Sequence, residues 1–128
     1  HNRSNKFKLG NLDISRDWGW AEEYVEAMQI IARADSLKDH VICTGKSTKL
    51  REFIQIVFKK LNMNWEDHVT HNKDLYRDTD IKISFGNPKP LEEDLNWKAE
   101  VSLDECINRL IDNELKNKRI DFPQDLKS

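Results

Sequence analysis

Hydrophobic residues recur every three or four positions along three stretches of the chain, the spacing of one buried face of an α-helix. The stretches begin near Ala21, Lys49 and Leu103, and the first two end near Ala34 and Leu61. We expect three principal helices there. Their buried faces would consist of Ala21, Tyr24, Val25, Met28, Ile31 and Ala32; of Leu50, Phe53, Ile54, Val57, Phe58 and Leu61; and of Leu103, Cys106, Ile107, Leu110 and Ile111.

Polar residues at helix starts support these boundaries. Ser47 or Thr48 can cap the second helix, because a hydroxyl accepts from the free amides of a first turn. Ser102 and Glu105 have the spacing of a capping box before the last helix. A turn over 87–90 precedes a shorter helix over 91–95, and Trp97 is expected in the core.

Short apolar runs bounded by turn residues predict strands over 6–12, 39–44 and 81–85. In the last run Ile81, Ile83 and Phe85 alternate with polar residues, as in a half-buried strand. The sequence therefore predicts a small α/β domain with short strands and about three principal helices. We expect it to cover residues 6–117, with a disordered lead over 1–5 and a polar tail over 118–128.

Composition narrows the class of protein. The chain has 128 residues, 38% of them hydrophobic, which suits one small domain. Its 21 basic and 23 acidic residues argue against a nucleic-acid-binding surface. No apolar run approaches membrane-spanning length and no signal peptide is evident, so we expect a cytoplasmic protein. Cys43 and Cys106 are expected to be buried free thiols.

Two stretches suggest chemistry that their surroundings do not support. The run Thr44–Thr48 resembles part of a phosphate-binding loop, but His40 stands where that motif needs its first glycine. His68 and His71 lie near acidic residues and could bind a metal ion. We favour a solvated loop in which Trp65 and Val69 turn inward.

Arginine residues next to predicted strands are candidates for anion binding. Arg16 lies in a polar turn between the first strand and the first helix, and Arg77 lies just before the last strand. A guanidinium group presents a planar fork of donors that matches a phosphate or a carboxylate. The alternative for Arg16 is a surface ion pair with Glu22 or Glu23, and such pairs contribute little.

Several blocks of residues, in the same order, resemble the C-terminal part of the GDP-mannose 4,6-dehydratases, which are extended short-chain dehydrogenases/reductases. The likeness covers roughly residues 7–115. The blocks are Gly10–Asp13, Arg16–Gly19, Glu23–Met28, Thr44–Gly45, Leu50–Phe53, Tyr76–Asp80, Gly86–Pro88 and Leu95–Lys98.

The resemblance implies roles for three residues. Arg16 and Arg77 would contact the diphosphate of GDP-mannose, and Asp80 would accept from the ribose hydroxyls. Asp78 departs from the pattern, because the family usually has proline there. Asp80 is one methylene shorter than the glutamate of many relatives.

The family's NADP site and catalytic tyrosine belong to a Rossmann half that has no counterpart in this sequence. The four glycines are too far apart for a dinucleotide fingerprint, and neither tyrosine is followed by lysine four positions later. We therefore expect a substrate-binding portion without catalytic residues, cofactor or metal of its own. The alternatives are another nucleotide-sugar dehydratase, epimerase or reductase, or a non-catalytic fragment that associates with a Rossmann half or with itself.

Overall fold

The computed structural model describes residues 6–77 and 79–120. The expected lead over 1–5 and residues 121–128 of the expected tail lie outside the described residues. The helices are α1 Ala21–Ala32, α2 Leu50–Lys60, α3 Lys89–Leu95 and α4 Leu103–Ile120, and the strands are β1 Phe7–Leu9, β2 Ser15–Asp17, β3 Ser47–Lys49 and β4 Val69–His71. Two short 3-10 turns, Trp65–Asp67 and Lys73–Leu75, flank β4.

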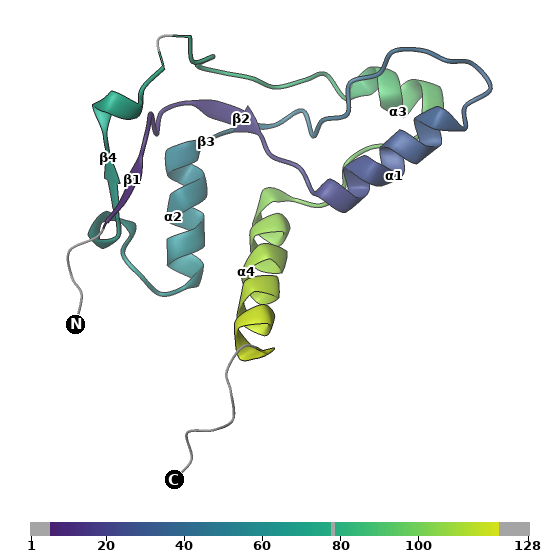
Figure 1. The fold of residues 1–128 in the computed structure, drawn as a ribbon. Coiled ribbons are helices and arrows are strands. Elements are labelled where there is room, and N and C mark those ends of the chain that lie inside the picture. The colour runs from purple at the N-terminus through teal and green to yellow at the C-terminus, as the bar shows by residue number, and fades with distance from the viewer. Residues whose placement is uncertain (1–5, 78, 121–128) are drawn as a thin grey trace.

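The elements form two groups joined by a central strand pair (Figure 1). One group contains α2 beside β1 and β4, which pair in parallel. The other contains α1 and α3, which lie side by side at the opposite end. Between them β2 and β3 pair antiparallel, and α4 descends from this middle region. None of the helices in the described part of the chain has the length and hydropathy that crossing a bilayer requires.

Each group has its own small hydrophobic core. In the first, Leu12, Ile54 and Val69 are buried between α2 and the parallel strand pair. In the second, Ala27 of α1 is buried against Leu91 of α3 and Trp97. Trp97 is therefore the core anchor that the sequence predicts, at 7% exposure.

The helices agree with the expected ranges to within a few residues, but the buried face of α1 does not. Val25 and Met28, expected in the core, are more than half exposed, whereas Ala27 is fully buried. The small side chain of Ala27 lets α1 pack against Leu91, a partner far along the chain. The packing surface is thus decided by tertiary contacts and not by the helical repeat alone.

The predicted N-terminal cap of α4 is confirmed in part, whereas the predicted N-terminal cap of α2 is wrong. Ser102 Oγ accepts from the amide of Glu105 at 3.3 Å. The N-cap of α2 is Lys49, without a side-chain hydrogen bond, because Ser47 and Thr48 belong to β3.

Strands are where the sequence prediction fails most. Residues 39–44 are irregular, although Cys43 is buried there. Residues 81–85 make only one isolated bridge, between Ile83 and Ser15. Conversely, β2, β3 and β4 lie where a turn, a helix start and a loop were expected.

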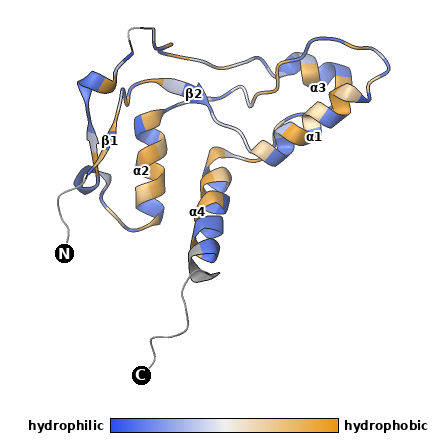
Figure 2. Cartoon of the chain, viewed as in Figure 1, coloured by the Kyte–Doolittle hydropathy of each residue, from blue (hydrophilic) through white to orange (hydrophobic). Residues whose placement is uncertain are grey.

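Hydrophobic residues are concentrated where α2 and α4 lie next to each other. Figure 2 shows hydrophobic residues along α2 and the first half of α4, and mostly hydrophilic residues in the second half of α4. The side chains of Phe53, Val57, Leu61, Ile107, Leu110, Ile111 and Leu115 line an apolar groove between these helices.

Replacing Leu91 with alanine tests the second core. Leu91 is 1% exposed, and deletion of a fully buried leucine side chain should lower the free energy of unfolding by about 2–5 kcal/mol. Urea denaturation measures this change. Leu37→Ala is the matched control, because Leu37 is 83% exposed, and its effect should stay within about 0.5 kcal/mol. Equal effects of the two variants would contradict the assigned core.

Candidate functional site

Strand β2 is hydrogen-bonded on both edges, and this places the three predicted site residues near one another. On one edge it pairs with β3, with Arg16 opposite Thr48. On the other edge the amide of Ser15 donates to Lys82 O at 2.8 Å, and the amide of Ser84 donates to Ser15 O at 3.0 Å. The segment that follows Arg77 and Asp80 therefore runs alongside the strand that carries Arg16.

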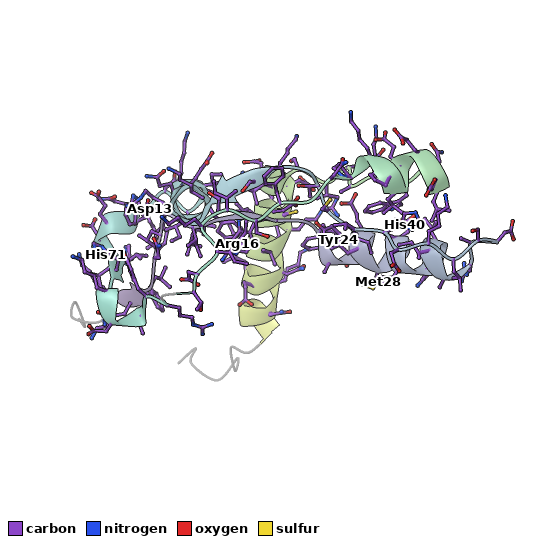
Figure 3. All side chains as sticks on the ribbon, turned by 90° about the horizontal axis from the view of Figure 1, so that it is seen from above. Asp13, Arg16, Tyr24, Met28, His40 and His71 are labelled. Carbon is purple, nitrogen blue, oxygen red and sulfur yellow. The ribbon has the colours of Figure 1, made fainter. Side chains whose placement is uncertain are left out.

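The side chain of Arg16 bridges β2 and this segment. Its Nη1 donates to Ser15 O at 2.9 Å and to Ile81 O at 2.6 Å. Its Nε and Nη2 donate to no acceptor among the described residues. Arg16 lies near the middle of the molecule, between the end marked by His71 and the end marked by His40 (Figure 3).

The alternative ion pair of Arg16 is not formed. Glu22 accepts instead from the indole nitrogen of Trp20 at 3.2 Å. Glu23 accepts from the backbone amides of Glu100 and Val101 at 2.9 and 3.1 Å, which ties α1 to the segment before α4. The two acids thus have structural partners, and Arg16 is held by carbonyl oxygens.

Arg77 and Asp80 lie at the two ends of one tight turn. The amide of Asp80 donates to Arg77 O at 3.0 Å, the hydrogen bond that closes a four-residue turn. Arg77 is exposed and Asp80 is half-buried. Because Arg16 bonds to the carbonyl of the residue after Asp80, all three predicted residues belong to one region of the surface.

Sequence reasoning missed Asp17 as a member of this region. Its carboxylate accepts from the amide and hydroxyl of Thr44 at 3.0 and 2.6 Å, and from the amide of Gly45 at 2.8 Å. These partners are 27 and 28 positions away along the chain. A local motif could not have indicated them.

Tyr24 packs beside the end of β2. A Cβ placed on Gly19 would lie 2.2 Å from the Tyr24 hydroxyl oxygen, so a larger residue there would have to displace the ring of Tyr24. Burial raises the pKa of Tyr24 to about 12, and the nearby carboxylate of Asp17 adds to the rise. The phenol therefore stays protonated over the physiological range.

The two cysteines are buried free thiols, as predicted. Burial is the main cause that raises the pKa of Cys43, and the same holds for Cys106. Both thiols are therefore protonated and weakly nucleophilic at neutral pH.

Within the described residues no group of metal ligands comes together, and three of the four glycines are packed against side chains. Within 6–77 and 79–120 no three histidine, cysteine or acidic residues come together as metal ligands, and His68 instead stacks on Phe58. The glycines do not leave the open backbone cradle that a pyrophosphate needs. Gly19 is filled by Tyr24, Gly45 by Pro88 and Gly86 by Cys43.

Solved structures of nucleotide-sugar enzymes contain this fold. RMD from Pseudomonas aeruginosa, solved with NADPH, aligns with a TM-score of 0.75 and 17% sequence identity. The alignment covers 89% of this chain and 37% of the RMD chain. The dTDP-glucose 4,6-dehydratase of Bacillus anthracis, solved with NAD, aligns with a TM-score of 0.79 and 12% identity, over 89% and 36%. The described part of the chain thus has a fold that these enzymes contain.

Comparison of the sequence with known families and relatives shows the family to which the chain belongs. The family model for GDP-mannose 4,6 dehydratase matches residues 1–110. GDP-mannose 4,6 dehydratase 1 of Arabidopsis thaliana is 34% identical over 111 residues, covering 87% of this chain and 31% of that protein. The human GDP-mannose 4,6 dehydratase is 34% identical over 122 residues, covering 82% and 33%. This chain belongs to the GDP-mannose 4,6-dehydratase family, and it spans about a third of the length of these relatives.

The environment of Tyr24 can be tested by pH titration. In a Tyr76→Phe variant the tyrosinate absorbance reports Tyr24 alone, and its midpoint should lie near pH 12. The midpoint in denaturant should be about 10. Because the folded state keeps a proton that the unfolded chain releases, this group's contribution to stability falls as pH rises from about 10 toward 12. A midpoint near 10 in a chain that circular dichroism shows to be folded would contradict the burial of Tyr24.

Proposed function

We propose that this chain is the substrate-binding portion of a GDP-mannose 4,6-dehydratase-like enzyme, which converts GDP-mannose to GDP-4-keto-6-deoxymannose. In this role it holds the diphosphate and ribose of GDP. The observation that carries the proposal is the hydrogen bond from Arg16 Nη1 to Ile81 O in a chain of this family. That bond links the arginine of β2 to the residue that follows Asp80.

Arg16 is suited to bind a phosphate group because one end of its guanidinium is already anchored. Nη1 is occupied by two carbonyl oxygens, which fixes the plane of the group. The opposite edge, formed by Nε and Nη2, carries parallel N–H groups that match two oxygens of one phosphate. Arg77 supplies a second guanidinium from the adjacent turn. Each such charge-assisted hydrogen bond contributes about 1.5–3 kcal/mol.

Asp80 is suited to bind the ribose. A carboxylate accepts from two neighbouring hydroxyl groups and so recognises a diol. Arg77 and Asp80 are held at the two ends of one turn, and the diphosphate and ribose are adjacent in a nucleotide. The same turn can therefore contact both parts of GDP.

The remaining chemistry belongs to the part of the relatives that this chain does not match. NADP supplies the hydride transfer when it is bound there, and the catalytic tyrosine lies there too. Ile81, Ile83 and Phe85 are each more than 60% exposed and belong to the segment that is bonded to Ser15 and Arg16, so that part of the enzyme can pack against them. This chain contributes the orientation of the sugar, in the cytoplasm.

Substitution of Arg16 tests the phosphate contact. A proton–nitrogen NMR titration with GDP should shift amides near Arg16, Arg77 and Asp80, and Arg16→Ala should weaken binding about 10- to 100-fold. Arg33→Ala is the matched control, because Arg33 lies beyond the far end of α1. Its affinity for GDP should match that of the unchanged chain. A folded chain that gives no response to millimolar GDP would contradict the assigned site for this chain alone.

Complementation tests the division of roles. The purified chain should not eliminate water from GDP-mannose, because the proposal places the NADP site and the catalytic tyrosine in the part of the relatives that this chain does not match. Mixing it with a separately produced Rossmann half of a relative, together with NADP, should restore the reaction. The Arg16→Ala chain should restore it less well at limiting GDP-mannose. Water elimination by the chain alone would refute the proposed division.

A further inference from the structure

The carboxylate of Asp17 uses both of its oxygens on one backbone turn. Oδ1 accepts from the amide and the hydroxyl of Thr44, and Oδ2 accepts from the amide of Gly45. The three distances lie between 2.6 and 3.0 Å. Hydrogen bonds to an ionised acceptor are stronger than neutral ones, so this turn is firmly attached to the end of β2.

The turn that Asp17 holds is itself packed against the segment after Asp80. Gly45 has a φ of +77°, and a Cβ there would lie 2.9 Å from two ring carbons of Pro88. A Cβ on Gly86 would lie 2.7 Å from the sulfur of Cys43. Residues 43–45 and 86–88 are therefore packed together so closely that a side chain on either glycine would clash with a side chain of the other segment.

The segment from Arg77 to Pro88 is consequently fixed to β2 at two places. Ser15 and Arg16 hold its residues 81–84 by hydrogen bonds. Asp17 holds its residues 86–88 indirectly, through the Thr44–Gly45 turn. Successive residues of a strand point to opposite faces, which lets Arg16 and Asp17 act on different parts of the segment.

We propose that Asp17 is a positioning residue of the diphosphate site. By holding the Thr44–Gly45 turn against Gly86–Pro88, it sets the Arg77–Asp80 turn relative to Arg16. The nature of the ligand in this inference rests on the proposed function. The positioning itself rests on the contacts of Asp17, Gly45 and Gly86.

Simple electrostatics predicts the opposite result, which makes the inference testable. Asp17→Asn removes a negative charge next to Arg16, and this change alone would favour an anion such as GDP. The asparagine amide, however, would face the Gly45 amide donor to donor and break at least one bond. If Asp17 positions the site, affinity for GDP should fall about tenfold despite the lost negative charge.

The experiment compares Asp17→Asn with Asp13→Asn and Thr44→Val in the whole chain. Asp13→Asn is the matched control, because Asp13 is an exposed acid on the same segment that pairs with Arg51. Thr44→Val removes one of the three bonds to Asp17, together with the bond that Thr44 Oγ1 accepts from the Lys46 amide, and should have an intermediate effect. If Asp17→Asn does not fold, Thr44→Val takes its place in the comparison with Asp13→Asn.

Amide hydrogen exchange without ligand is measured first. In Asp17→Asn the amides of Gly45 and Ser84 should exchange about tenfold faster, while those within α2 should be unchanged. A merely structural role would speed exchange throughout the chain. Unchanged exchange at Ser84, or an equal change in Asp13→Asn, would overturn the inference.

The GDP titration is then repeated in an Arg16→Ala background. If Asp17 acts through the relative placement of Arg16 and the Arg77–Asp80 turn, its substitution should matter less once Arg16 is gone. Fully additive effects would overturn the inference. If the unchanged chain does not bind GDP, the proposed function fails for the isolated chain, and the exchange pattern alone decides the positioning role.

Discussion

The pairing of β2 on both of its edges is the constraint on which the site depends. On one edge the three residues of β2 pair with β3, which leads directly into α2. On the other edge Ser15 of β2 is hydrogen-bonded to the segment over 82–84. The two small cores lie at opposite ends of the molecule, and the β2–β3 pair lies between them (Figure 1). The side chains of Arg16 and Asp17 extend the same connection outward, toward Ile81 and toward Thr44.

The helices could be predicted because their signals are local. The expected second helix, 49–61, is close to α2 at Leu50–Lys60, and the serine cap of the last helix is present. Strands of three residues carry no comparable signal. β1 is a strand because it pairs with β4, which lies far along the chain. Residues 39–44 were expected to form a strand, but their end is bonded to the carboxylate of Asp17 and not to a neighbouring strand. The buried face of α1 likewise depends on Leu91.

The residues of the candidate site likewise differ in whether the sequence alone could indicate them. Arg16 could be selected from its chemistry and its place before a helix, although it lies in a strand and not in a turn. Arg77 and Asp80 acquired roles through resemblance to a family, since isolated charged residues are usually solvated. Asp17 could not be selected at all, because its importance comes from the approach of residues 43–45 and 86–88.

The parallel pairing of β1 with β4 has a consequence for how the chain is made. Phe7 pairs with Val69, so during synthesis β1 must wait until about sixty further residues have left the ribosome before its partner exists. At about 5–20 residues per second this delay lasts several seconds. Over that interval β4, the strand with which Phe7 and Leu9 pair in the folded chain, has not yet been made.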